Sequence, residues 1–159
     1  MIPITPQSRY DALVKLREGK IGREIFSDRE IYEEELERVF TRAWLFVGHE
    51  SQVPNPGDFF TSRMGAESVI LARDKKKKVH VFLNSCRHRG MKVCQYDHGN
   101  TQLFTCPYHS WSYTTDGKLF GVPQFKQLYE GCMDKEEWSL IEVPNMEVYK
   151  GTVWASWDK

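Results

Sequence analysis

The chain has 159 residues, which is enough for one domain, or for one domain with an additional arm. Basic and acidic residues each number 22, so the formal net charge is zero, and this balance excludes the basic face that nucleic-acid binding requires. Hydrophobic residues make up 40% of the chain, enough for a buried core. No apolar run approaches the roughly 18 residues of a membrane helix. We expect neither a nucleic acid nor a membrane as partner.

The first twenty residues contain several charges and no apolar segment, so they do not have the pattern of a secretory signal. Of the four cysteines, Cys86 and Cys106 each lie within three residues of a histidine. Without an export signal, this spacing favours metal binding over disulfides. We therefore predict a cytoplasmic, reducing location.

Residues 1–43 are predicted to form a helical N-terminal arm. Ser27 and Glu30 have the spacing of a capping box at a helix start. Apolar residues then recur at helical spacing, with acidic residues mostly on the other face. The apolar positions are Tyr32, Leu36, Val39 and Phe40, continued by Ala43 and Trp44, and the helical pattern extends to about Val47.

Residues 44–159 are predicted to form a second domain, built from short β-rich runs that turn residues interrupt. Many short strands with frequent turns favour a mainly β, antiparallel fold. The predicted strands are 45–48, 59–61, 68–71, 79–83, 102–104 and 148–157, and a lysine run at 75–78 lies at a hairpin tip.

Two segments directly after predicted strands carry residues suited to bind metal. The first has the pattern C-x-H at Cys86 and His88, and the second has C-x-x-H at Cys106 and His109, with seventeen residues (89–105) between them. Loops anchored on a sheet can wrap a metal centre while their ends stay fixed.

This donor set predicts a Rieske-type [2Fe–2S] cluster, in which histidines replace two of the usual four thiolates on one iron. Replacing anionic with neutral ligands raises the potential to about −150 to +300 mV, against about −400 mV for a plant-type cluster. The alternative is a zinc site of two cysteines and two histidines. Zinc sites usually take like ligands from each knuckle, whereas each loop here mixes the two kinds.

At these motifs the sequence resembles the large (alpha) subunits of bacterial aromatic-ring-hydroxylating dioxygenases. The resemblance is carried by Cys-Arg-His-Arg-Gly at 86–90, by Cys-Pro-Tyr-His-x-Trp at 106–111, and by Tyr113 with Gly117-Lys118-Leu119. It extends to Trp44 with Gly48-His49, to Gly57-Asp58-Phe59 and to the terminal Trp154-Ala155.

The resemblance implies a Rieske-type antiparallel three-sheet β domain with a two-hairpin subdomain that binds the cluster. Cys86 and Cys106 would bind the inner iron, and His88 and His109 the outer one. The family usually has glycine where this chain has Ser110, so a left-handed backbone there would be strained. High-potential Rieske proteins carry a disulfide across the two loops, but Tyr108 occupies the position of one of its cysteines here. This difference favours the low end of the Rieske potential range.

The resemblance also implies an enzyme component, the electron-transfer part of a ring-hydroxylating dioxygenase. A ferredoxin, an NADH-dependent reductase, or both would supply the electrons, and a mononuclear Fe(II) in a second domain would dihydroxylate the aromatic ring. The full-length protein would assemble as a trimer of alpha subunits with a beta subunit, and His109 is the candidate for electron exit. No catalytic residues are expected in this segment, because no pair of closely spaced histidines for the facial triad is found. We interpret the chain as the N-terminal part of an alpha subunit; a stand-alone Rieske ferredoxin and a zinc-stabilised interaction module are the alternatives.

The remaining candidates have simpler interpretations. His49, His80 and His98 are expected to be hydrogen-bonded structural histidines. Cys94 and Cys132 are expected to be buried free thiols, and Trp111 and Tyr113 core aromatics beneath the cluster. Arg87 and Arg89 could be a solvated pair or charge partners that order the loop.

Overall fold

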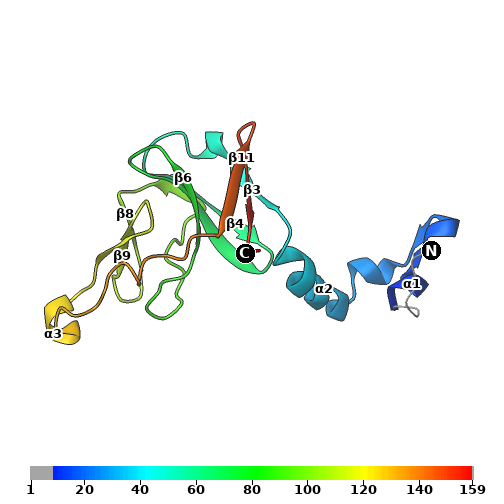
Figure 1. The fold of residues 1–159 in the computed structure, drawn as a ribbon, viewed down its shortest axis with the longest axis horizontal. Coiled ribbons are helices and arrows are strands. Elements are labelled where there is room, and N and C mark those ends of the chain that lie inside the picture. Colours follow the sequence, from blue (N-terminus) through cyan, green and yellow to red (C-terminus); the bar gives the residue numbers. More distant parts are fainter. Residues whose placement is uncertain (1–8, 159) are drawn as a thin grey trace. The chain divides into compact units, whose positions relative to one another are not determined.

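The computed structural model describes residues 9–158 and divides the chain into two compact units, residues 1–39 and 40–159 (Figure 1). Each unit is described by itself. The first contains short elements only, and its described residues bury one large apolar side chain, that of Ile31. Its elements are α1 (Arg9–Leu13), β1 (Val14–Lys15), η1 (Leu16–Glu18), β2 (Lys20–Ile21), η2 (Arg23–Phe26), α2 (Arg29–Glu35) and the π-helical turn η3 (Leu36–Phe40), which runs into the second unit.

The cap of helix α2 is Asp28 and not Ser27, so the predicted capping box is wrong. The Asp28 carboxylate accepts a hydrogen bond from the Ile31 N–H at 3.0 Å, which satisfies one of the free donors at the helix start. The Ser27 hydroxyl instead donates to the carbonyl of Arg23, because Ser27 ends the preceding 3₁₀ turn.

The helical segment also ends earlier than the apolar spacing predicts. It stops at Phe40, and Leu45 already begins strand β3 (Leu45–His49). The cause is tertiary, because Leu45 pairs with Ala155 on another strand, and such pairing overrides a weak local preference. Tyr32 and Val39 are 52% and 49% exposed, so this apolar face of the arm is not buried among the described residues.

The second unit consists of three antiparallel sheets, as predicted. The four-stranded sheet has the order β6-β5-β4-β7, and the others are β11-β12-β3 and β10-β9-β8. The strands besides β3 are β4 (Asp58–Met64), β5 (Glu67–Arg73), β6 (Val79–Leu83), β7 (His98–Asn100), β8 (Leu103–Thr105), β9 (Ser112–Thr114), β10 (Leu119–Gly121), β11 (Asn145–Tyr149) and β12 (Thr152–Ser156), with the turns η4 (Glu50–Gln52) and α3 (Phe125–Tyr129). Figure 1 shows β8, β9 and α3 toward one end of this unit, and β3 with β11 toward the other.

The four-stranded sheet is the middle layer, because its two faces are buried against different partners. Side chains alternate along a strand. Accordingly, Val69 and Leu71 of β5 enter a core shared with β3 and β12, while Ile70 and Ala72 enter the core that contains Cys86 and Cys106. This explains why β5 is an almost unbroken apolar run, and it places the two cysteines on a rigid layer.

The prediction of one final strand over residues 148–157 is wrong, since the chain forms a hairpin there. Strands β11 and β12 pair from Asn145 with Ser156 to Tyr149 with Thr152, across a turn at Lys150 and Gly151. Both turn residues have positive φ, 49° and 84°, as two-residue hairpin turns require. A side chain at Gly151 would also meet the ring of His49 at 2.4 Å. No helix among residues 9–158 is long and apolar enough to cross a membrane.

His80 is a buried structural histidine, as predicted, and it joins three segments. Its Nδ1 lies 2.7 Å from the Glu142 carboxylate and its Nε2 lies 3.2 Å from the Asp74 carboxylate. Backbone hydrogen bonds from Leu83 to Ile141 and from Val143 to Val81 hold the same segment against β6. Burial by itself would raise the pKa of Asp74, but hydrogen bonds from His80 and from the Lys78 N–H hold this pKa below its ordinary value.

Replacing Asp74 with asparagine is therefore expected to make the free energy of unfolding less dependent on pH in the acidic range. A lowered carboxyl pKa contributes stability that is present above the unfolded pKa and lost as pH falls through the folded one. Asp74→Asn should reduce the free energy of unfolding in urea more at about pH 6 than at about pH 3, on either side of the ordinary aspartate value near 4. Equal losses at both pH values, or the same pattern for the exposed Asp97→Asn, would contradict this role.

Candidate metal centre

The two predicted ligand loops have the same backbone frame. In the first, the Cys86 N–H donates to the Met91 carbonyl, and the Gly90 N–H donates to the Cys86 carbonyl, both at 2.8 Å. In the second, the Cys106 N–H donates to the Trp111 carbonyl at 2.8 Å, and the Ser110 N–H donates to the Cys106 carbonyl at 3.0 Å. Each cysteine therefore begins a six-residue loop closed by two hydrogen bonds. Strand β6 ends just before the first loop, and the β8–β9 hairpin carries the second.

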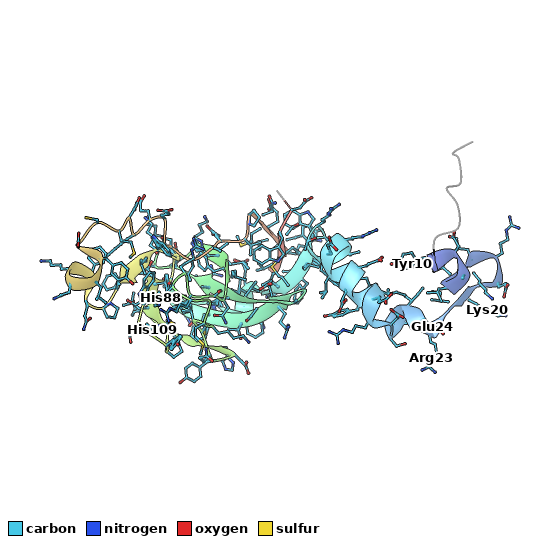
Figure 2. The ribbon with its side chains drawn as sticks, turned by 90° about the horizontal axis from the view of Figure 1, so that it is seen from below. Tyr10, Lys20, Arg23, Glu24, His88 and His109 are labelled. Atoms are coloured by element: carbon cyan, nitrogen blue, oxygen red, sulfur yellow. The ribbon has the colours of Figure 1, made fainter. Side chains whose placement is uncertain are left out.

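The histidines of the two loops face each other. The Nδ1 atoms of His88 and His109 lie 3.1 Å apart, and the rings meet edge to face at 4.7 Å and 75°. Figure 2 shows the two residues side by side on the second unit. Since metal–imidazole bonds are about 2.0–2.1 Å long, two nitrogens at this separation can bind one metal ion. Both side chains are half-buried, so this pair lies at the surface of the loops.

The cysteines lie deeper than the histidines. Cys86 and Cys106 are 3% and 2% exposed and belong to the core beneath the loops. Burial raises the pKa of the Cys86 thiol, and the neighbouring Cys106 thiol raises it further. Burial has the opposite effect on His88 and lowers the pKa of its imidazole, with contributions from His109 and Arg89. A neutral imidazole is the form that binds metal.

Tyr113 supports the first loop from below. Its hydroxyl is 3.2 Å from the Cys86 sulfur and accepts a hydrogen bond from the Arg87 N–H at 3.1 Å. The side chain is fully buried, and burial together with Cys86 raises the pKa of its phenol, which therefore keeps its proton. Trp111 is also buried, 3% exposed, so the prediction that these two residues are core aromatics is confirmed.

Asn84 is a supporting residue that the sequence analysis did not identify. Its side-chain amide donates to the Cys94 carbonyl and accepts from the Cys94 N–H, both at 2.9 Å. This pair of bonds ties the start of the first loop to the segment that leaves it. The available signal was an asparagine two residues before a ligand cysteine, but its partner is ten residues away and local patterns do not reveal it.

The other candidate residues lie outside this pair of loops or have structural roles. Cys94 is buried as predicted, but Cys132 is exposed, because the segment after α3 lies at the surface. None of the four cysteines, all of which lie among the described residues, forms a disulfide. His49 caps the 3₁₀ turn η4 by accepting from the Ser51 N–H, and His98 is exposed on β7. The guanidinium of Arg87 lies over the ring of Trp138.

The donors are thus arranged as two pairs, with two buried sulfurs below and two half-exposed imidazole nitrogens above. Among residues 9–158, no three or more His, Cys, Asp or Glu side chains gather so as to hold one metal ion. Two thiolates with two imidazoles are the ligands of a Rieske [2Fe–2S] cluster, one pair for each iron. The residues fit this cofactor.

A family model described as the Rieske [2Fe–2S] domain matches residues 43–146. The chain belongs to this family. Membership implies the [2Fe–2S] cluster as cofactor, in agreement with the donor set. The three-sheet fold is likewise shared with a crystal structure of naphthalene 1,2-dioxygenase from a Rhodococcus species, at a TM-score of 0.83 and 40% identity over 87% of this chain and 31% of that chain.

The similar curated proteins are alpha subunits of aromatic-ring dioxygenases. Benzene 1,2-dioxygenase subunit alpha of Pseudomonas putida is 45% identical over 96% of this Rieske chain and 33% of its own length. Biphenyl 2,3-dioxygenase subunit alpha of Rhodococcus jostii is 47% identical over 92% of this chain and 31% of its own length. The chain therefore spans about a third of the length of these relatives.

Ser110 stores strain at a defined point of the second loop. Its φ is 57°, in the left-handed region, and the equivalent residue of the first loop is Gly90 with a φ of 73°. We expect Ser110→Gly to increase the free energy of unfolding by about 1 kcal/mol, because a side chain in this region costs about 1–2 kcal/mol. Denaturant unfolding of the cluster-loaded chain measures the change.

Gly90→Ser is the matched reverse variant. A Cβ at Gly90 would meet the Ser85 hydroxyl at 3.8 Å, an ordinary contact, so the strain of the backbone alone should lower stability by a similar amount. Loss of stability in Ser110→Gly, or no loss in Gly90→Ser, would show that the two loops do not share one frame.

Proposed function

We propose that this chain transfers single electrons through a [2Fe–2S] cluster bound by Cys86, His88, Cys106 and His109. The observation that carries the proposal is the opposed pair of equivalent loops, each of which supplies one buried sulfur and one half-exposed imidazole. When bound, such a cluster supplies reversible one-electron chemistry at a potential that its ligands and hydrogen bonds determine.

Each ligand pair has a distinct role in the proposal. Cys86 and Cys106 hold the inner iron as thiolates, and burial in the core keeps water from them. His88 and His109 bind the outer iron through Nδ1, which leaves Nε2 free as a hydrogen-bond donor toward a partner. Residues 44–159 would form the Rieske domain and residues 1–43 a helical arm; the family match over 43–146 supports this division.

We further propose that the chain is part of a dioxygenase alpha subunit that acts on aromatic rings. Electrons from NADH would arrive through a reductase or a ferredoxin, and would leave toward a mononuclear iron outside this chain. Identity of 45% to 47% to alpha subunits of that class supports the assignment. His109 is the proposed exit, toward a carboxylate of a neighbouring alpha subunit, and the half-exposed imidazole supports it.

The two alternatives differ from this proposal in the metal and in the partners. A zinc-stabilised module needs four donors around one ion, whereas the donors here form two pairs. A stand-alone Rieske ferredoxin would use the same cluster, but the similarity to alpha subunits covers 96% of the chain and so includes most of residues 1–39.

The purified chain is expected to contain two irons and two acid-labile sulfides, with a red-brown colour and a Rieske-type EPR signal after reduction. Alanine at Cys86 or Cys106 should abolish the cluster, because each removes a proposed thiolate ligand. Elemental analysis and EPR measure both effects.

The control is Cys94→Ala, which removes a buried thiol from the same core without removing a proposed ligand. It should keep two irons and the EPR signal. A colourless protein with one zinc per chain, or loss of the cluster in Cys94→Ala but not in Cys86→Ala, would contradict the assignment.

Tyr113→Phe is expected to lower the reduction potential and leave the iron content unchanged. The phenol can donate to the Cys86 sulfur, which stabilises the more negative reduced state, and this donor is lost in the variant. A hydrogen bond of about 1 kcal/mol corresponds to about 40 mV for one electron. In a redox titration the exposed Tyr149→Phe should not differ from the unchanged chain; a potential in Tyr113→Phe equal to that control would refute the role of the phenol.

A further inference from the structure

The segment between β10 and β11 packs beside the proposed metal centre. It holds one short helix, α3, and otherwise lacks regular structure. Its side chains nevertheless pack against the core that contains both ligand cysteines, with Tyr129, Met133 and Trp138 partly buried and Leu140 buried. The ligand motifs do not explain why so many large side chains gather there.

One face of His88 is covered by an indole. The imidazole and the ring of Trp111 are nearly parallel, with centroids 5.0 Å apart and an angle of 14° between their planes. The stacked contact with the indole favours this plane of the imidazole, so Trp111 restricts the orientation of the ring. His109 differs, because its ring lies against the exposed Tyr108 of its own loop, at 3.8 Å.

Trp111 is held in turn by the segment after β10. Trp138 meets it edge to face at 5.8 Å and 76°, and Tyr129 does so at 6.1 Å and 73°. Such edge-to-face pairs are favourable arrangements of aromatic rings. Trp111 is 3% exposed, so it has little space in which to move.

Arg87 closes the arrangement. Its guanidinium lies 5.9 Å from the centroid of Trp138, and its Nε is buried without a hydrogen-bond partner among the described residues. A cation over an indole face is attracted by the ring, so the contact with Trp138 holds the arginine. Because Arg87 precedes His88 in the chain, the contacts run from Arg87 to Trp138, to Trp111 and back to His88.

We propose that Trp138 is a positioning residue that fixes the imidazole plane of His88 through Trp111. The proposal rests on the ligand role of His88 proposed above. The segment between β10 and β11 then has a role at the metal centre. The indole of Trp138, distant in sequence from His88, holds this proposed outer-iron ligand in place through Trp111. Among the described residues, the ring contacts of His109 are instead to His88 and to Tyr108 of its own loop.

The experiment is pulsed EPR of the reduced, cluster-loaded chain, which resolves the nitrogen couplings of the two imidazole ligands. Trp138→Leu is expected to keep two irons per chain, while the coupling of one imidazole broadens and shifts because its ring samples more orientations. Trp138→Phe keeps a flat ring and should restore most of the narrow coupling. The potential should shift in Trp138→Leu as well, since a looser wall admits water near the reduced site.

Trp154→Leu is the matched control. Trp154 also forms an edge-to-face pair, with Phe46, but in the β11-β12-β3 sheet. It should leave the couplings and the potential unchanged. Should Trp138→Leu bind less than two irons, Tyr129→Leu removes the other edge contact on Trp111 and is measured in the same way.

The proposal would be overturned if fully loaded Trp138→Leu, or Tyr129→Leu in its place, had the same couplings and the same potential as the unchanged chain. That result differs from failure of the ligand assignment, in which His88→Ala would retain both imidazole couplings or the unchanged chain would show none.

Discussion

The requirement that the proposed function places on this protein is that two separate loops hold four donors at a fixed separation. Neither loop can do so alone, since each supplies one sulfur and one nitrogen. The chain meets the requirement by closing both loops with the same pair of backbone hydrogen bonds and by anchoring them on strands that share one core. The middle sheet, buried on both faces, makes that core rigid, and the other sheets follow from the need to cover its two faces.

The proposed sulfur and nitrogen donors differ in burial, and this difference separates protection of a cluster from access by a partner. Cys86 and Cys106 are 3% and 2% exposed and belong to the core, whereas the half-exposed imidazoles of His88 and His109 lie where a partner can approach. Tyr113, Asn84 and the wall formed by Trp111 and Trp138 surround the site from below and from the side. This arrangement suits the proposed electron carrier, because a cluster bound there would be protected while one edge of the proposed ligand set remained accessible.

Local sequence patterns predicted the mainly β class and strand β6, because short apolar runs are local signals; the C-x-H and C-x-x-H spacings are local signals too, and they gave the proposed ligand pairs. Features set by distant partners were not predictable in this way. Leu45 leaves the helical pattern because it pairs with Ala155, and the last strand splits because Lys150 and Gly151 adopt a hairpin turn. At the site, the roles of Asn84 and Trp138 were not predicted for the same reason, since their partners lie ten and twenty-seven residues away in sequence.

The central claim is that thiolates and imidazoles are segregated onto two different irons. Mössbauer spectroscopy of the ⁵⁷Fe-loaded chain tests it most directly. We expect two inequivalent irons in the oxidised chain and, after one-electron reduction, a ferrous signal confined to one of them, because neutral imidazoles at the outer iron favour the added electron there. Two equivalent irons in the oxidised chain, or a single mononuclear iron signal, would contradict this account.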